Sequence, residues 1–134
     1  MKKILVPTDF SKNAYAALFY VSKLFSGEGL QITILHSFGD EISMMTSRVD
    51  IGRSENIIEK LFSQSEEDGK QLMHKIRLDT GKLPHTYSMV STPAQLSSTI
   101  NQMVASEGFD LVVMGTKGRT GAEDILMGST TVEI

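Results

Sequence analysis

Short apolar segments recur along the chain and are separated by longer stretches of mixed character. These segments cover residues 3–6, 31–38, 86–90 and 111–114. Their length and their content of β-branched and other apolar residues predict strands, and the unbroken apolar character of the first predicts burial on both faces. Pro7 ends the first strand, because proline cannot continue the backbone ladder.

Apolar residues at helical spacing fill the intervals between these strands. Residues 12–25 carry apolar side chains at spacings of four, three and four, and Ser11 is a suitable N-cap for them. A second helix is predicted from Ser54 to about Leu78. A third is predicted from about Leu96 to Gly108, with Pro93 near its start.

Three segments depart from this regular pattern. Residues 39–53 have no firm period and contain Gly and Asp, so we expect a loop there. Gly69 lowers the helix propensity in the middle of the second helix. At the end of the chain Ser129 is a suitable cap for residues 130–134, which we predict to be the first turns of a fourth helix.

Strands that alternate with helices of ten or more residues indicate βαβ crossovers, and therefore an α/β fold with a parallel sheet and helices on both faces. Ligands bind such sheets beyond the carboxyl ends of the strands, where the strand order reverses. If the first and fourth strands are neighbours, the exit Pro7-Thr8-Asp9 lies near the exit Met114-Gly115. Asp9 then either contacts a ribose or a hydrated metal ion, or caps the first helix.

Length, charge and cysteine content narrow the class of protein. A chain of 134 residues is expected to form one domain, residues 1–134. Its net charge of −3 gives no general reason to expect nucleic acid or an acidic membrane as partner. It has no cysteine and no apolar run near the roughly 20 residues that span a bilayer, so we expect a cytoplasmic protein.

The segment after the fourth predicted strand has the most unusual composition. It reads Gly115-x-x-Gly118, then nine residues, then Gly128-Ser129, with Arg119 adding positive charge. Glycines let successive N–H groups converge on one point, and a helix N-terminus attracts anions, phosphate above all. The alternative is a glycine-rich surface turn that joins a strand to a helix.

Several motifs of nucleotide and acyl-transfer chemistry are missing. The chain has no Gly-x-x-x-x-Gly-Lys-Ser/Thr loop, no Gly-x-Gly-x-x-Gly after the first strand, and no Gly-x-Ser-x-Gly elbow. His36, His74 and His85 match no metal-ligand spacing. An enzyme would have to rely on Asp9 with Ser129 or Thr130, for which the sequence identifies no activating base.

The whole chain resembles the universal stress protein family, and the glycine motif resembles that of its ATP-binding branch. The opening residues 4–11, Ile-Leu-Val-Pro-Thr-Asp-Phe-Ser, carry the resemblance independently of that motif, and Pro93 stands where the family has a proline before its third helix. The resemblance implies a flavodoxin-like, or adenine nucleotide α-hydrolase-like, fold with strand order 3-2-1-4-5. It also implies that ATP, with a divalent ion such as Mg²⁺, binds across the ends of the first and fourth strands.

Carried over by position, the resemblance assigns residues to each part of the nucleotide. Pro7, Thr8 and Asp9 would border adenine and ribose, and Met114 and Gly115 would lie at the edge of the nucleotide. The residues implied at the phosphates are Gly118, Gly128, Ser129 and Thr130, and we count Arg119 with the binding residues because of its positive charge.

The sequence departs from the family pattern in three places. Ser37 stands where ATP-binding members have an apolar residue against adenine, and Ser91 stands where the family commonly has glycine. The chain also ends at Ile134, before the final strand of the family. We therefore expect a fifth strand to be absent, through truncation, as half of a tandem protein, or with a partner chain supplying the edge. Because an exposed parallel edge favours association, we expect a homodimer or a larger homo-oligomer.

Two functions of different kind follow from these residues, beside the enzyme considered above. The first is an ATP-binding stress-response module in which the adenine nucleotide changes conformation or partner choice. The alternative is a nucleotide-independent member of the family that acts as a dimeric interaction module, which Ser37 and Ser91 favour and the intact glycine motif opposes.

Overall fold

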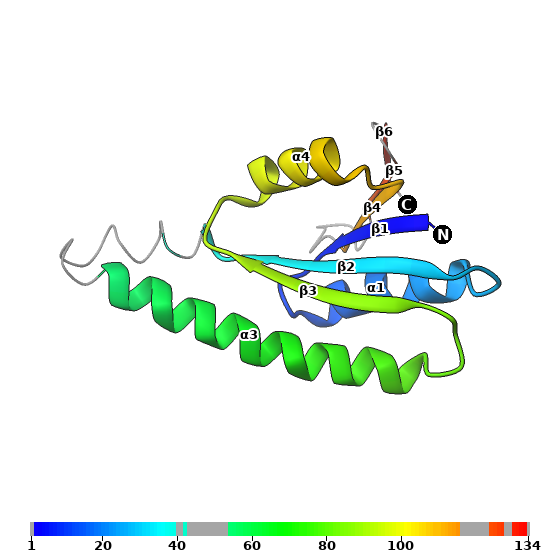
Figure 1. Ribbon diagram of the computed structural model, residues 1–134, viewed down its shortest axis with the longest axis horizontal. Helices are drawn as coiled ribbons and strands as arrows, with labels where there is room; N and C mark the ends of the chain where they lie inside the picture. Colours follow the sequence, from blue (N-terminus) through cyan, green and yellow to red (C-terminus); the bar gives the residue numbers. More distant parts are fainter. Residues whose placement is uncertain (1, 40–41, 43–53, 116–123, 128–129, 134) are drawn as a thin grey trace.

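The computed structural model describes residues 2–39, 42, 54–115, 124–127 and 130–133. Strands and helices alternate up to β4, and two further strands follow (Figure 1). Their bounds are β1 Lys2–Pro7, α1 Lys12–Leu24, β2 Leu30–Ser37, α3 Ser54–Asp79, β3 Thr86–Thr92, α4 Leu96–Glu107, β4 Leu111–Met114, β5 Asp124–Met127 and β6 Thr130–Glu133.

The strands form one sheet in the order β3-β2-β1-β4-β5-β6. The first four strands are parallel, which confirms the predicted parallel sheet with order 3-2-1-4. Helices α1 and α3 cover one face of this sheet and α4 covers the other (Figure 1). The strand order reverses between β1 and β4, so the carboxyl ends of these two strands meet at the position where ligands bind such sheets.

Both faces of the sheet bury apolar side chains. Ile4 and Val6 of β1 pack with Leu18 of α1 and Ile76 of α3. Leu5, between them in the sequence, packs on the other face in a cluster that includes Val112 and Phe109, against which the partly buried Leu96 and Ile100 of α4 lie. Alternate residues of a strand point to opposite faces, so the unbroken Ile-Leu-Val run of β1 is explained by helices on both sides.

The helix ends agree with the predicted caps. The Ser11 hydroxyl accepts a hydrogen bond from the Ala14 N–H at 3.1 Å and caps α1. Gly108 ends α4 in the left-handed conformation, with φ of 68°, and its N–H donates to the Val104 carbonyl. Pro93 precedes α4 by three residues, in the connection from β3.

The prediction of a fourth helix over residues 130–134 is wrong. Residues Thr130–Glu133 form β6, which pairs antiparallel with β5, and β5 in turn pairs antiparallel with β4. The expectation of an exposed edge at β4 is therefore also wrong, because β5 covers that edge; β5 is antiparallel to β4 and so differs from the parallel fifth strand that the family resemblance implies. In the sequence, an apolar run and a β-branched run flank Gly128-Ser129, and two runs separated by Gly-Ser are typical of a β-hairpin.

Gly69 contributes to the packing of α3 on β3, although glycine is unfavourable inside a helix. It is buried in the middle of α3, and a Cβ atom placed on it would lie 2.9 Å from Cγ of Met89. A side chain at this position would require the Met89 side chain or α3 itself to shift. The glycine thus sets how closely the long helix approaches the edge strand.

Candidate functional site

The exit of β1 forms a turn that is held by its own side chains. The Thr8 N–H donates to the Leu35 carbonyl of β2 at 2.8 Å, which keeps the end of β1 on the sheet. The Thr8 hydroxyl accepts from the Phe10 N–H at 3.0 Å, and the carboxylate of the exposed Asp9 accepts from the Ser11 N–H at 2.9 Å. Ser11 is the N-cap of α1, and Asp9 supports the turn that leads into it.

Phe10 adopts a backbone conformation that bulky residues rarely take. Its φ is 63°, and it is the one residue other than glycine with positive φ in the described part of the chain. The Phe10 ring lies against the buried His36 at the end of β2, with ring centroids 4.6 Å apart. Strain of this kind is found where the surrounding structure holds it in place, often at ligand sites.

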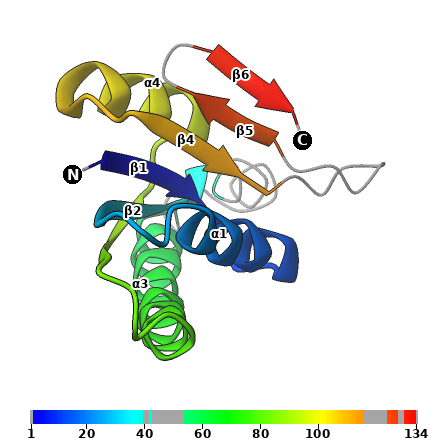
Figure 2. The same ribbon diagram turned by 90° about the vertical axis from the view of Figure 1, so that its right-hand side faces the viewer.

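The exit of β4 lies beside the exit of β1, as predicted. Because Leu5 pairs with Val112, Pro7 and Met114 stand at the same level two residues further along each strand. Figure 2 shows the arrows of β1 and β4 side by side and pointing the same way. A Cβ atom on Gly115 would lie 2.5 Å from the Asn13 carbonyl oxygen, so only glycine lets the chain leave β4 this close to α1.

Ser37 lies at the exit of β2, and its side chain is held by the connection to α4. Its hydroxyl donates to the Ala94 carbonyl. Gly39 lies close to the same connection, since a Cβ atom on it would meet the Ala94 carbonyl oxygen at 2.7 Å. The Ser37 hydroxyl is therefore occupied within the protein at the position where the family resemblance implies contact with adenine.

Ser91 belongs to a chain of hydrogen bonds that the sequence did not reveal. The Ser91 hydroxyl lies 2.6 Å from the hydroxyl of the buried Ser65 on α3. Ser65 lies 2.6 Å from Nδ1 of His36. Ser91 therefore points toward α3, and Ser65 is a residue whose role depends on the packing of α3 onto the sheet.

The structure describes one of the remaining residues predicted at the phosphates. Gly118, Arg119, Gly128 and Ser129 lie outside the described residues. Thr130 is described, and it opens β6 opposite Met127. Met127 pairs with Leu111 at the amino end of β4, about 10 Å along the strand from Met114.

Next to the β1 exit lies a second group of polar residues. A cavity of about 330 Å³ between α1 and α3 is lined by residues that include Phe10, Tyr15, Gln71 and Lys75. The Tyr15 hydroxyl donates to the Asp79 carboxylate, and the Lys75 ammonium lies 4.0 Å from the centre of the Tyr15 ring. Burial, followed by this hydrogen bond and the negative charge of Asp79, raises the pKa of the Tyr15 phenol well above its ordinary value.

Two kinds of feature are not found among the residues that the structure describes. No group of three or more His, Asp or Glu side chains there is arranged to hold a metal ion. No helix there combines the length and the apolar character that a membrane span requires. Within the described part of the chain, Asp9 places a carboxylate at the β1–β4 edge.

Fold and strand order together define an α/β domain in which the strand order reverses between β1 and β4. Comparison with known proteins gives the family: the chain matches the Universal stress protein family over residues 1–134 and belongs to it. It is similar to universal stress protein MJ0577 of Methanocaldococcus jannaschii, with 28% identity over 144 residues that cover 99% of this chain and 87% of the relative. Universal stress protein MJ0531 of the same organism is 30% identical over 136 residues, covering 99% of this chain and 75% of the relative.

Solved structures agree with this assignment. The structure of MJ0577, described in a study of structure-based assignment of biochemical function, superposes with a TM-score of 0.64 and 26% identity over 89% of this chain and 77% of that one. The universal stress protein UspA from Lactobacillus plantarum has the same fold, with a TM-score of 0.66 and 18% identity over 88% of this chain and 81% of that one.

Proposed function

We propose that this universal stress protein is an ATP-binding regulatory module, with the nucleotide held at the carboxyl ends of β1 and β4. The observation that carries the proposal is the pairing of β1 with β4, which brings the Pro7-Thr8-Asp9 turn beside Met114-Gly115, where the glycine motif begins. A ligand at this edge touches two elements that lie far apart in the sequence. Its binding is therefore suited to change the conformation of the loop after β4, and with it partner choice.

Each residue at this edge has a role consistent with adenine nucleotide. The exposed Asp9 carboxylate can accept hydrogen bonds from ribose hydroxyls or hold a hydrated Mg²⁺, while the Thr8 and Asp9 hydrogen bonds keep the turn in place. Met114, which is only partly buried, offers apolar surface beside the base, whereas Pro7 is buried at the end of β1. Gly115 keeps the start of the glycine motif against α1, so that the loop after it leaves from a defined point.

The phosphates are assigned to the glycine motif by the family resemblance. Gly118, Gly128 and Ser129 would donate backbone N–H groups, and Arg119 would add positive charge. Thr130 would join them only if β5 and β6 rearrange, because their pairing holds Thr130 at the other end of β4.

Ser37 is expected to make the affinity for ATP low. Because its hydroxyl is bonded to the Ala94 carbonyl, it offers adenine less apolar surface than the aliphatic side chain of ATP-binding relatives. The same bond favours the alternative function, a nucleotide-independent interaction module that acts as a homodimer or larger assembly. In that case the outer strand β6 is the natural edge for pairing between copies, since edge strands offer unpaired backbone groups. For either function we place the protein in the cytoplasm, in accord with its lack of cysteine.

Calorimetric titration with ATP and Mg²⁺ at up to millimolar concentration tests the proposal. We expect saturable heat from the unchanged protein and none from the double variant Gly118→Val and Gly128→Val. Gly27→Val is the matched control, because a Cβ atom on Gly27 meets nothing within 4 Å, and it should bind as the unchanged protein does. No heat with the unchanged protein, together with no adenine nucleotide in the purified sample by mass spectrometry, would favour the interaction module instead.

A further inference from the structure

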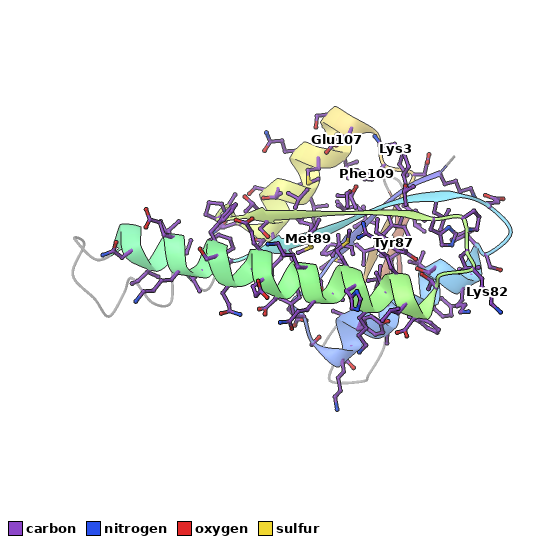
Figure 3. The ribbon with its side chains drawn as sticks, turned by 60° about the horizontal axis from the view of Figure 1, so that its bottom comes forward. Lys3, Lys82, Tyr87, Met89, Glu107 and Phe109 are labelled. Carbon is purple, nitrogen blue, oxygen red and sulfur yellow. The ribbon has the colours of Figure 1, made fainter. Side chains whose placement is uncertain are left out.

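The proposed function does not use a groove beside β3, which lies two strands beyond β1 on the side away from β4. It has a volume of about 430 Å³ and runs between α3 and β3. Met73 of α3 and Met89 of β3 contribute apolar surface to it, and Phe62 lines it further along α3. Tyr87 and Met89 project from β3 toward α3 (Figure 3).

The strand that borders this groove is an edge strand. Among the described residues β3 is the outermost strand next to β2, and no strand pairs with its other side. In a parallel ladder alternate residues direct both backbone groups to the same neighbour. Because the Thr92 carbonyl accepts from Phe38 on the β2 side, residues 87, 89 and 91 direct theirs outward. The contact of the Arg77 guanidinium with the Tyr87 carbonyl, at 3.5 Å, agrees with this direction.

The helix that borders the groove supplies its charge. Lys70, His74 and Arg77 line it at spacings of four and three residues, and so they follow one face of α3. Glu66 is the acidic residue among the lining side chains, and β3 carries no charged residue. The end of the groove near Tyr87 is therefore basic, although the whole chain has a net charge of −3.

Helix and strand run in opposite directions along the groove. Arg77 contacts Tyr87, Gly69 packs on Met89, and Ser65 bonds to Ser91. Four residues of α-helix rise about 6 Å, and two residues of a strand rise about 6.6 Å. Carboxylates two residues apart on an added strand therefore match donors four residues apart on α3, the Lys70 ammonium and the His74 imidazole N–H.

We propose that the β3 edge and α3 together bind an extended acidic peptide segment of a partner protein, which adds to the sheet as a strand antiparallel to β3. Backbone groups of the peptide pair with those of Tyr87, Met89 and Ser91, and two alternate acidic side chains meet Lys70, His74 and Arg77. On binding, Arg77 exchanges its contact with the Tyr87 carbonyl for a peptide carboxylate. An apolar residue at the amino end of the segment lies against Phe62. Antiparallel pairing is chosen because it is slightly more stable per residue than parallel pairing.

The test uses the full chain and the peptide acetyl-Leu-Thr-Glu-Thr-Glu-Thr-amide, with binding followed by amide NMR shifts and calorimetry. We expect saturable binding with a dissociation constant below about 1 mM, and shifts that concentrate on residues 86–92 and 69–77. The same peptide with lysine in place of both glutamates should not bind. Absence of binding by the acidic peptide, or equal binding of both, overturns the proposal.

Two further comparisons separate strand addition from attraction of charges. Lys70→Glu with Arg77→Glu should weaken binding at least about tenfold, and Lys70→Gln with Arg77→Gln should weaken it less while disturbing the fold least. The control variant, Lys12→Glu with Lys82→Glu, changes the net charge by the same amount at positions outside the groove. Lys82 lies beyond the end of α3 (Figure 3). This variant should bind the acidic peptide as the unchanged protein does. In an added strand, alternate peptide amides face β3 and solvent in turn. N-methylation of the set that faces β3 should abolish binding, and N-methylation of the other set should not. Equal effects of the two sets would contradict strand addition.

A second copy of this chain is the competing occupant of the edge. Sedimentation of the unchanged protein and of the Lys70→Glu, Arg77→Glu variant distinguishes the two. The peptide proposal is overturned if the unchanged protein is a dimer, the variant dissociates it, and the acidic peptide does not. A state of association unaffected by the variant agrees with it. Neither result depends on ATP, so the test is independent of the proposed nucleotide site.

Discussion

The ring of Phe10 packs against the ring of His36, with their centroids 4.6 Å apart and their planes inclined by 58°. This contact joins the turn after β1 to the end of β2. His36 is in turn hydrogen-bonded to Ser65 on α3, and Ser65 is hydrogen-bonded to Ser91 on β3. The turn proposed to border the nucleotide is thus connected to three neighbouring strands of the sheet.

Replacing Phe10 should show that its backbone is strained. Glycine adopts positive φ freely and alanine does not, so Phe10→Gly should be more stable than Phe10→Ala by about 1 kcal/mol, although both lose the ring contact. Urea unfolding measures the difference. The same pair of substitutions at Phe19, inside α1, should give the opposite order by a similar amount. The same order at both positions would contradict the strain.

Gly115→Ala should destabilise the protein by about 1–3 kcal/mol. The added Cβ atom would stand 2.5 Å from the Asn13 carbonyl oxygen, and both positions belong to backbone that cannot give way locally. Thermal unfolding checks this, with Gly27→Ala as a control expected to change stability by less than about 0.5 kcal/mol. Equal stability of the two variants would show that the exit of β4 is not confined by α1.

Ser65→Ala should cost about 1–2 kcal/mol of stability because it removes a buried hydroxyl that bonds both His36 and Ser91. Ser63→Ala, an exposed change on the same helix, should cost less than about 0.5 kcal/mol. Denaturant unfolding of both variants at the same pH gives the comparison. A loss in Ser63→Ala as large as that in Ser65→Ala would argue against the hydrogen-bond chain.

Tyr15 should make the protein less stable at alkaline pH. Because its pKa is raised in the folded state, the folded protein keeps the phenol proton where the unfolded chain loses it, above about pH 10. The stability from this group is fully present below that pH and falls as the pH rises further. Urea midpoints between pH 8 and about pH 11 should therefore decline less steeply in Tyr15→Phe. Parallel decline of the two proteins would contradict the assignment.

Asp9→Asn separates the turn from the proposed ligand contact. Asparagine retains an oxygen that can accept from the Ser11 N–H, so the stability should change by less than about 0.5 kcal/mol. If Asp9 meets ribose or Mg²⁺, calorimetry should show ATP affinity reduced at least about tenfold. Asp9→Ala should lose both stability and affinity. Unchanged affinity in Asp9→Asn would restrict this residue to supporting the turn.

The sequence predicted correctly those elements whose packing partners could also be identified from the sequence. The Ile-Leu-Val run of β1 requires cover on both faces, and the amphipathic helices between the strands supply it. Ser11 and Gly108 act through contacts within a few residues, so their cap roles follow from local chemistry. The prediction for residues 130–134 failed because Gly-Ser suits both a helix cap and a hairpin turn. The pairing of β6 with β5, which in turn pairs with β4, decided between helix and strand.

The sequence by itself determined the strands and helices up to β4, the parallel sheet and the burial of β1, because right-handed crossovers leave few arrangements for this pattern. The meeting of Pro7-Thr8-Asp9 with Met114-Gly115 required β1 and β4 to be neighbours, a strand order that the family resemblance implied and the structure confirms. Only the tertiary structure decided the positive φ of Phe10, the bonding of Ser91 to Ser65 rather than toward the ligand edge, and the groove along β3. Each of these depends on how closely one element approaches another. That distance is set by side chains from distant parts of the chain, such as Gly69 against Met89, and no local pattern encodes it.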